Sequence, residues 1–475
     1  MSMRRLSVNA LRAVALAAAL AAVLTGCALQ SPPPRADLQR DTLPHTQVPA
    51  AWKAGADAAA LQSGSWLAGF GDPALTALVA EALAHNADLK VAAARVEQAA
   101  GLLQVASATL LPAVGVLGTY SGKAGGGGGL NALFLNASLE LDVWGRVRYG
   151  EAAAQAQADA VEADYAYARQ SLAATVAKSW YLAIEAGLQR VLVEDALRAA
   201  TELQRLASER LRIGAGDESA VADAAANVAG MRDRLRQTRQ ARDEALRALE
   251  LLLGRYPAAE IEVAQSLAPM PGPLPAGLPS ELLERRPDVI AAERRVAAAF
   301  NRVGEAKAAR LPRISLTASV SSISSDLLVL QDRSNPGVGL GANLFAPLYQ
   351  GGALQAQVDI RSAEQRQAMA EYARVAQRCF GEVENALGAE LALREREALL
   401  ARNIADSQRA LDLTKVQYRV GKTDLRSVEQ RQLALLSART ALLRVQTDRL
   451  AQRANLYLAL GGGFQDTAGA PLAAR

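Results

Sequence analysis

The sequence predicts a mainly α-helical fold with a small β part, because one order of elements occurs twice along its 475 residues. In each copy a helix precedes two short strands, a very long helix, a turn and a second long helix. The copies cover residues 66–256 and 280–464. Matching segments keep their order at offsets of about 200 to 207 residues: Ala87-Asp88-Leu89 and Pro287-Asp288-Val289, Leu111-Pro112 and Leu311-Pro312, Arg212-Ile213-Gly214 and Arg419-Val420-Gly421, Leu253-Gly254 and Leu460-Gly461.

The long helices are predicted from stretches that contain no proline. Residues 146–213 and 352–420 are two such stretches, and a helix of this length extends about 100 Å at about 1.5 Å per residue. A second helix follows each of them, at 218–253 and 425–460, with apolar residues at the seven-residue spacing of coiled coils. Helices this long do not suit a compact enzyme domain and favour a rod or a tube.

Short segments with alternating apolar and polar residues predict the β part. In each copy one side of the two segments is apolar and the other side is small or polar. Segments of about ten residues with this alternation are typical of outer-membrane barrel strands. A half-buried strand of a soluble sheet has the same pattern, but here two pairs occupy matching places. The segments are 113–121, 132–142, 313–323 and 337–348, and the polar side includes Asn136, Ser138, Glu140, Ser315 and Thr317.

Four strands per chain predict self-association. Four strands cannot close a barrel, and an open sheet edge cannot face lipid because its backbone groups would lack partners. Two chains would give eight strands and an interior filled by side chains, whereas three would give twelve strands and room for a lumen. We therefore predict a homotrimer in which a twelve-stranded outer-membrane β-barrel continues into a tube of twelve helices.

The N-terminus has the form of a bacterial lipoprotein signal. Three arginines flank the start of an apolar run, which is shorter than the roughly 20 residues that a spanning helix needs. The run ends in Leu24-Thr25-Gly26-Cys27, which resembles a lipobox. Residues 1–26 are therefore expected to be removed. Cys27 is expected to be acylated, for example with palmitate, and to anchor the chain in outer-membrane lipid.

Three further segments are predicted to lie outside the repeats. Residues 27–65 are rich in proline, alanine and small polar residues and are expected to form an N-terminal tether. A proline-rich linker at 257–279 joins the two copies. The tail at 465–475 is expected to be disordered.

Composition argues against two other classes of protein. Arg4, Arg5 and Arg12 of the 52 basic residues lie in the signal, which leaves 49 against 48 acidic ones. This balance removes the electrostatic basis for nucleic-acid binding. The sequence has no glycine-rich phosphate loop and no paired His/Cys spacing, and its only histidines are His45 and His85. No enzyme activity, catalytic residue, cofactor or metal site is predicted.

Several short motifs from about residue 66 to 464 occur together in one known family. They are the lipobox ending in Cys27, Trp66, Phe70, Asp72-Pro73-Ala74-Leu75, Ala82-Leu83, Asn86, Asp88-Leu89, Leu111-Pro112, Leu141-Asp142-Val143-Trp144-Gly145-Arg146, Arg285-Arg286-Pro287-Asp288 and Tyr418-Arg419-Val420-Gly421. With these motifs the chain resembles the TolC-like outer-membrane efflux channels, specifically the lipoprotein (NodT-type) branch that serves resistance-nodulation-division pumps. The resemblance implies a trimer with most of its mass in the periplasm, where the helices form an α-barrel closed at its tip.

The resemblance also implies a function and partners. Drugs or other small molecules would pass through passively, as in multidrug resistance. The flow would be driven by an inner-membrane resistance-nodulation-division pump coupled through a periplasmic adaptor (membrane fusion) protein.

Two groups of residues would carry that function. The turns between the long helices match the tips where the adaptor docks. The tip is closed in this family by carboxylates and bulky apolar groups shortly before the second turn, where Asp412 and Leu413 are the candidates, although Lys415 occupies a position at which relatives often carry an acid. The docking candidates are Gly214, Gly216 and Asp217 in the first turn and Val420, Gly421 and Asp424 in the second. Glycine and aspartate at these places also predict ordinary helix caps.

Three alternatives to small-molecule efflux remain open at this stage. Type I protein secretion uses related ducts, but these usually lack the lipid anchor. Metal-ion export would use the same conduit. A non-conducting coiled-coil envelope lipoprotein would share the lipobox and the long helices, but it would not require alternating strands at duplicated places.

Overall fold

The structure is a computed structural model in which two compact units can be described. It describes residues 29–55, 66–120, 131–272, 277, 279–324 and 337–461, so Cys27 and the predicted tail lie outside the described residues. Each unit takes segments from both copies of the sequence pattern. Unit 1 comprises Met1–Thr46, Ala94–Ala163 and Ile290–Val375, and unit 2 comprises Gln47–Ala93, Asp164–Val289 and Ala376–Arg475.

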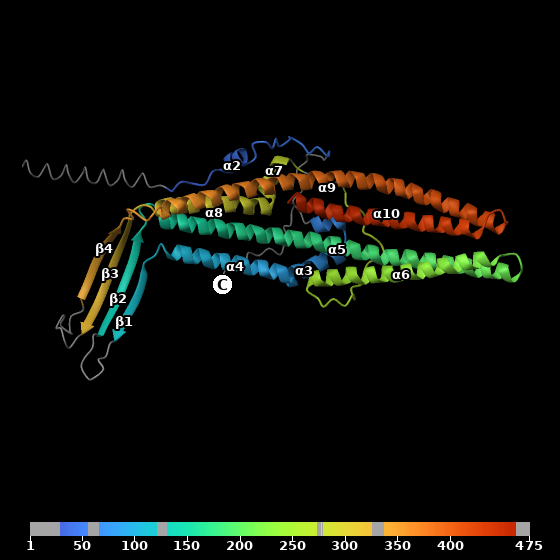
Figure 1. The fold of residues 1–475 in the computed structure, drawn as a ribbon, viewed down its shortest axis with the longest axis horizontal. Coiled ribbons are helices and arrows are strands. Elements are labelled where there is room, and N and C mark those ends of the chain that lie inside the picture. Colours follow the sequence, from blue (N-terminus) through green and yellow to red (C-terminus); the bar gives the residue numbers. More distant parts are fainter. Residues whose placement is uncertain are drawn as a thin grey trace, which may run out of the picture. The chain divides into compact units, whose positions relative to one another are not determined.

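Helices make up most of the described chain, which confirms the mainly helical class (Figure 1). No described helix is long and apolar enough to cross a membrane. The elements in chain order are α2 (Arg35–Thr42), the 3-10 helix η1 (Trp66–Phe70), α3 (Pro73–His85), α4 (Ala87–Ala108), β1 (Ala113–Tyr120), β2 (Asn131–Leu141), α5 (Arg146–Arg212), α6 (Glu218–Leu253), α7 (Pro279–Arg285), α8 (Pro287–Ala308), β3 (Arg313–Ser324), β4 (Gly337–Phe345), α9 (Ala353–Arg419) and α10 (Leu425–Ala459).

Unit 1 contains one antiparallel sheet with the order β1-β2-β3-β4. Residues directly opposite each other in such a sheet project from the same face. Leu135 pairs with both Val116 and Val320, and Val320 pairs with Val338. The same register carries apolar residues across all four strands on this face. Most of its large side chains are exposed, and Leu340 on β4 reaches 85%.

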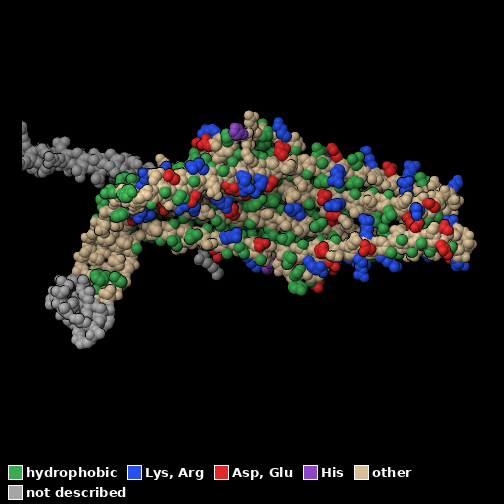
Figure 2. Space-filling view, viewed as in Figure 1, with side chains coloured by type: hydrophobic (Ala, Val, Ile, Leu, Met, Phe, Trp, Pro, Cys, Tyr) green, Lys and Arg blue, Asp and Glu red, His purple; other side chains and the backbone are tan. Residues whose placement is uncertain are grey.

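The opposite face of the sheet is mostly small and polar, although the register also places Leu117, Phe134 and Phe345 on it. Thr317 pairs with Ser138 on one side and with Gly341 on the other, and Asn136 pairs with Gly115. The described strands contain only two charged residues, Glu140 and Arg313, whereas charges are distributed along the helices (Figure 2). The sheet therefore has an apolar face, a polar face and two edge strands, β1 and β4, that pair on one side only.

The passage from β2 into α5 is fixed by a set of polar contacts within unit 1. The Arg146 guanidinium donates to both carboxylate oxygens of Glu140, at 3.0 and 2.7 Å. The Asp142 carboxylate accepts from the backbone amides of Val147 and Arg148, at 3.0 and 2.9 Å, and so caps the first turn of α5. Trp144 Nε1 donates to the carbonyl of Pro312 at 2.8 Å. These bonds set the direction in which the helix leaves the sheet.

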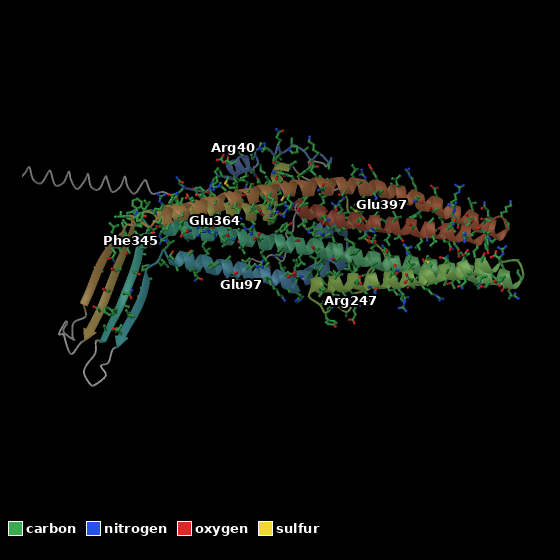
Figure 3. The ribbon with its side chains drawn as sticks, in the orientation of Figure 1. Arg40, Glu97, Arg247, Phe345, Glu364 and Glu397 are labelled. Atoms are coloured by element: carbon green, nitrogen blue, oxygen red, sulfur yellow. The ribbon has the colours of Figure 1, made fainter. Side chains whose placement is uncertain are left out.

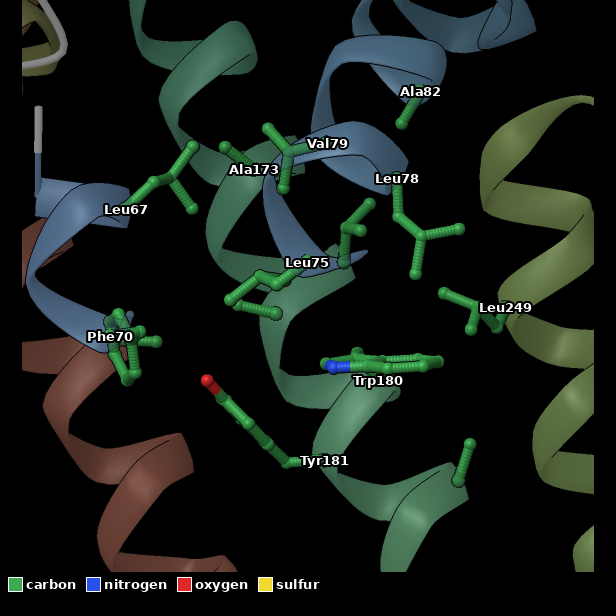
Figure 4. Close-up of a cluster of buried hydrophobic side chains, with 14 of the residues drawn as sticks. Leu67, Phe70, Leu75, Leu78, Val79, Ala82, Ala173, Trp180, Tyr181 and Leu249 are labelled. Atoms are coloured by element: carbon green, nitrogen blue, oxygen red, sulfur yellow. The ribbon is translucent and has the colours of Figure 1, made fainter. Parts of the chain in front are cut away.

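The largest apolar cluster of unit 2 gathers η1, α3, α5, α6 and α10 (Figure 4). Asp72 lies at the edge of this cluster and links two of its helices. One of its carboxylate oxygens caps α3 by accepting from the Leu75 amide at 3.0 Å, and the other accepts from Trp180 Nε1 on α5 at 2.8 Å. Phe70 and Tyr181 lie beside each other with ring centroids 5.7 Å apart. Segments distant in sequence thus share one core.

Two equivalent joints in unit 2 tie the end of a long helix to the start of a shorter one. Asn86 Nδ2 donates to the carbonyl of Leu252 at 3.0 Å. Arg286 Nη1 donates to the carbonyl of Ala459 at 3.0 Å. Residues 86 and 286 differ by 200 and residues 252 and 459 differ by 207, which are the offsets between the sequence copies. In both places a buried side chain satisfies a carbonyl that the helix end leaves unbonded.

The second joint contains a buried ionic cluster. Arg286 is fully buried and donates to both oxygens of Asp288, at 3.0 and 2.8 Å, while Glu382 lies 2.7 Å from its Nη1. Cys379 is also fully buried, with its Sγ 3.8 Å from an Asp288 oxygen, and burial raises the pKa of its thiol to about 12. The thiol is therefore protonated and unreactive at neutral pH.

The described part of the proline-rich linker packs on the helices of unit 2. Glu250 accepts from the amides of Ala259 and Glu260, each at 2.7 Å, and these bonds lower its pKa despite the opposing effect of burial. Arg453 donates to the carbonyl of Gly272 and to the Glu390 carboxylate. Further along α9 the Glu397 carboxylate, labelled in Figure 3, accepts from Gln446 at 3.0 Å.

The described part of the predicted tether also carries structure. In unit 1 it forms α2, where Leu38 is buried and Arg35 Nε lies 2.7 Å from a Glu293 oxygen. In unit 2 the indole of Trp52 is buried and donates to the carbonyl of Gly277 at 3.1 Å. Each contact fixes the tether to the unit in which it lies.

Candidate functional site: the helical turns and the gate

The conformation of the turn between α5 and α6 is explained by its residues. Gly214 has φ +75°, a left-handed conformation that suits glycine, and it lies two residues after the end of α5 at Arg212. The Ala215 amide donates to the carbonyl of Arg210 at 2.8 Å and closes the helix end. Gly216 lies where a Cβ would come within 3.0 Å of the Leu211 nitrogen. Asp217 then caps α6 through the Ala220 amide at 2.7 Å.

The turn between α9 and α10 has the same construction. Gly421 has φ +76°, and the Lys422 amide donates to the carbonyl of Gln417 at 2.8 Å. Asp424 caps α10 by accepting from the Ser427 amide at 2.9 Å. Hydrogen bonds from the Ser427 hydroxyl and amide lower the pKa of Asp424. The first turn behaves alike, because bonds from the hydroxyl of Ser219 and the amide of Ala220 lower the pKa of Asp217.

Each turn presents one large apolar side chain to solvent. Ile213 is 63% exposed and Val420 is 64% exposed. They occupy equivalent places, directly before the left-handed glycine of their turns. The two turns therefore expose matched apolar side chains at the same position.

The two helical hairpins are linked in unit 2 close to their turns. The guanidinium of Arg210 on α5 lies over the ring of Tyr418 on α9, 4.7 Å from its centroid. Arg426 on α10 pairs with Asp223 on α6 at 3.1 Å. Apolar residues from all four helices pack into one cluster beneath these contacts: Leu203, Ala207, Ala224, Leu411, Leu425, Val428 and Leu435.

The two gate candidates lie on α9 about two turns before its end. Asp412 is exposed and accepts from Gln408 Nε2 at 3.1 Å, and Leu413 is 58% exposed. The preceding residue, Leu411, is buried in the apolar cluster. The gate candidates therefore point away from the core of their own chain.

A buried carboxylate near the turns has no signal in the sequence. Glu429 on α10 is 7% exposed, and its Oε1 has no hydrogen-bond partner among the described residues. Burial raises the pKa of Glu429 and Asn227 on α6 lowers it, while the charges of Asp223 and Arg426 act on it in opposite directions. The heptad pattern predicts that the neighbouring Val428 is buried. It gives no indication that Glu429 is also enclosed. Within the described residues, no group of His, Cys, Asp and Glu could hold a metal ion.

With this geometry in place, comparison with known proteins decides the family. The model of a family described as outer membrane efflux protein matches the chain twice, over residues 78–255 and 278–462. The chain belongs to this family. The resemblance seen in the sequence is thereby confirmed, and the chain is an outer-membrane component of an efflux system.

Relatives of the outer membrane efflux protein family match almost the whole chain. Cation efflux system protein CusC of Escherichia coli O6:H1 is 31% identical over 456 residues, which cover 94% of this chain and 98% of CusC. The pyoverdine export outer membrane protein OpmQ of Pseudomonas aeruginosa is 33% identical and covers 84% of this chain and 87% of OpmQ.

Solved structures of related channels have the same fold. The outer-membrane channel OprN superimposes with a TM-score of 0.78 at 28% identity, covering 90% of this chain and 100% of OprN. A crystal structure of CusC gives 0.77 at 28% identity, covering 88% of this chain and 99% of CusC. Both relatives are outer-membrane proteins by name or family, which agrees with the location of this chain.

Proposed function

We propose that this chain is the homotrimeric outer-membrane conduit of a tripartite efflux system and has no enzymatic activity. The observation that carries the proposal is the sheet of unit 1. One of its faces is apolar and exposed, the other is mostly small and polar, and among the described residues β1 and β4 each pair with one strand only. Such a sheet suits lipid on one side and water on the other once copies of the chain close it.

Three chains complete the conduit. Four strands from each form a twelve-stranded β-barrel, and the two long helices of each repeat, four per chain, form a twelve-helix periplasmic α-barrel. The paired joints at Asn86 and Arg286 and the matched turns support a duplicated architecture, with repeats at 66–256 and 280–464 and a linker at 257–279. Cys27 carries the lipid after removal of residues 1–26, residues 27–65 lead from it, and 465–475 form a tail.

The turns are the docking points for a periplasmic adaptor, which couples the conduit to an inner-membrane resistance-nodulation-division pump. Support comes from Ile213 and Val420, which are apolar, exposed and held by capped glycine turns. Asp412 and Leu413 close the tip, because three copies of an outward-facing carboxylate and leucine would meet around a threefold axis. A ring of carboxylates also favours cations electrostatically.

The cargo belongs to the class of small molecules or ions, and selection lies mainly with the pump. Relatives at similar identity are named for cations, pyoverdine and toluene. Metal-ion export is therefore a second form of the same function, supported by the similarity to CusC over 94% of this chain. Type I protein secretion is less well supported, because Cys27 in its lipobox favours the efflux branch.

The first experiment is native mass spectrometry of the particle extracted in detergent, followed by conductance in planar bilayers. We expect three chains with three acylated N-termini and a measurable ion conductance. A monomer or a non-conducting dimer would favour a coiled-coil envelope lipoprotein instead. Turnover of a substrate by the purified particle would contradict the absence of enzymatic activity.

Adaptor docking is tested by placing charges on the turns. Ile213→Asp combined with Val420→Asp should lower adaptor affinity at least about tenfold, because burying two carboxylates in an apolar contact is unfavourable. The matched control is Leu251→Asp, since Leu251 is 61% exposed on α6 but is not in a turn. Binding is measured on trimers of unchanged mass. Equal affinity for both variants would show that the turns are not the docking points.

A further inference from the structure

A cleft in unit 1 lies beside the first described residues of the chain. Its walls come from the N-terminal segment, from residues at the start of α5, from α8 and the residue Leu311 beyond it, and from α9. They combine apolar and aromatic side chains with the polar side chains of Gln30 and Gln365. The lining includes Leu29, Trp144, Tyr149, Phe300, Val303 and Leu311. The lining residues include one cation, Lys307, and no carboxylate. We call this space the Tyr149 cleft.

The N-terminal segment is held at the Tyr149 cleft by a specific bond. The backbone amide of Gln30 donates to the hydroxyl oxygen of Tyr149 at 2.8 Å. Leu29 packs at the junction of β2 and α5, where a Cβ on Gly145 would lie 3.6 Å from its Cγ. The chain therefore enters the described structure at the cleft itself.

The position of the Tyr149 ring is set by its contact with α8. A Cβ at Gly304 would come within 2.7 Å of two carbons of the Tyr149 ring, so the ring rests directly on the glycine. Trp144 is held by its bond to the Pro312 carbonyl. The aromatic walls are thus fixed by contacts that do not involve the N-terminal segment.

We propose that the Tyr149 cleft holds an acyl chain carried by Cys27. The proposal rests on the acylation proposed above. Cys27 precedes Leu29 by two residues, and two residues span at most about 7 Å, so the lipid begins within reach of the cleft. The apolar and aromatic part of the lining suits a hydrocarbon chain, and the lining residues include no carboxylate. The tyrosine hydroxyl, Lys307 and the two glutamines suit the polar end of the chain. The Gln30–Tyr149 bond then positions the anchored N-terminus at the base of the sheet.

Photo-crosslinking of the full-length acylated protein tests this assignment. Cells are grown with a diazirine fatty acid, the membranes are irradiated, and the digested protein is analysed by mass spectrometry. We expect the acylated N-terminal peptide to be joined to peptides from 142–149 or 303–313. Crosslinks from Cys27 to membrane lipid alone would overturn the proposal. So would cleft peptides joined only to phospholipid, which would make the cleft a phospholipid site.

Two variants sharpen the test. Gly304→Leu fills the cleft and displaces Tyr149, and it should reduce the crosslink at least about tenfold. Its matched control is Gly101→Leu on α4, where a Cβ meets nothing within 4 Å, and which should leave the yield unchanged. Tyr149→Phe keeps the ring but removes the oxygen that accepts from Gln30, so it should lower the yield even if Gly304→Leu fails to fold. Equal yields in all of these proteins would contradict the proposal.

The intact mass separates this inference from the proposed function. A chain that conducts and is acylated at Cys27, but gives no crosslink to the cleft peptides, would overturn the acyl cleft and leave the conduit standing. A chain without acyl groups would overturn both the lipid anchor and the cleft assignment.

Discussion

At the scale of single residues, Arg286 is the most completely enclosed charge among the described residues. Its carboxylate partner Asp288 is also buried; burial raises the pKa of Asp288, but bonds and charges from Arg286 and Arg378 outweigh this and lower it. The depressed pKa means that this stabilisation is present above the ordinary pKa of an aspartate and is lost as pH falls. Arg286→Ala should destabilise the protein by about 3 kcal/mol, because it removes the buried cation that donates to both Asp288 oxygens and leaves only the partly exposed Arg378 beside them.

The neighbouring Arg285 provides the control for this prediction. It pairs with Glu281 at 2.9 Å on the surface, and its side chain is 39% exposed. Exposed pairs contribute little, so Arg285→Ala should cost less than about 1 kcal/mol. Denaturation of both variants in the same detergent gives the comparison. Similar losses in the two proteins would mean that the buried cluster is not a stabilising joint.

Glu429 leads to a prediction of the opposite pH dependence. Burial raises its pKa, a bond with Asn227 opposes this, and Asp223 adds a repulsion that Arg426 partly offsets. A carboxyl with a raised pKa binds more protons when folded, so stability falls as pH rises from its ordinary pKa through the raised one. Glu429→Gln should therefore stabilise the protein at pH 8 by about 1–3 kcal/mol, because the neutral amide avoids the cost of enclosing a carboxylate charge. The gain should shrink at pH 5.

Thermal unfolding at pH 5, 6.5 and 8 measures this effect. The control is Glu202→Gln on α5, because Glu202 is exposed and its bond with Arg205 lowers its pKa. That change should be nearly neutral at each pH. A Glu429→Gln protein that loses stability at pH 8, or that shows the same Tm difference at all three values, would contradict the prediction.

At the scale of elements, the left-handed glycine of a tip turn has a measurable consequence. Gly421→Ala places a side chain at φ +76° and should destabilise the hairpin by about 1–2 kcal/mol. Gly388→Ala is the matched control, because Gly388 lies inside α9 with open space around its Cβ. There alanine should stabilise by about 0.5–1 kcal/mol. Opposite signs in the Tm shifts are expected, and a gain in both variants would argue against the turn geometry.

The strands and helix ends could be predicted because their signals are local. A strand alternates with a period of two, so the sequence alone placed Val116, Leu135 and Val320 on apolar sides, and the register brings them to one face. Residue 213 was the predicted end of the first long helix because a glycine and an aspartate follow it, and α5 ends at Arg212. Turn chemistry of this kind depends on a few neighbouring residues.

The buried polar joints could not be predicted, because they depend on partners far away in the sequence. Arg286 and Ala459 are 173 residues apart, and the motif around Arg286 does not indicate which carbonyl its side chain will bond. Glu429 is enclosed because α6 packs beside α10, and a heptad pattern in one helix does not state which polar neighbours become covered. Long-range packing decides both cases, as it does for Arg453, which donates to the carbonyl of Gly272, 181 residues away.

At the scale of the whole molecule, the strand directions determine how copies can close a barrel. Each strand of the sheet is antiparallel to the next, so β1 and β4 of one chain are also antiparallel to each other. The β4 edge of one copy can therefore pair with the β1 edge of the next and continue an all-antiparallel sheet. Any number of copies preserves this direction, and the width of the lumen then depends on how many chains join.

Cysteine pairs on the two edges test that closure. According to the register, Leu117 and Thr119 on β1 and Asn343 on β4 lie on the same face as Asn136 and Thr317, whereas Leu344 lies on the apolar face. Leu117→Cys or Thr119→Cys combined with Asn343→Cys should oxidise to covalent trimers, because paired residues on one face bring their Cβ atoms to about 4.5–5.5 Å. Leu117→Cys with Leu344→Cys places the thiols on opposite faces and should stay monomeric on a denaturing gel. Crosslinking of the opposite-face pair, or of neither, would mean that β1 and β4 do not form the seam between copies.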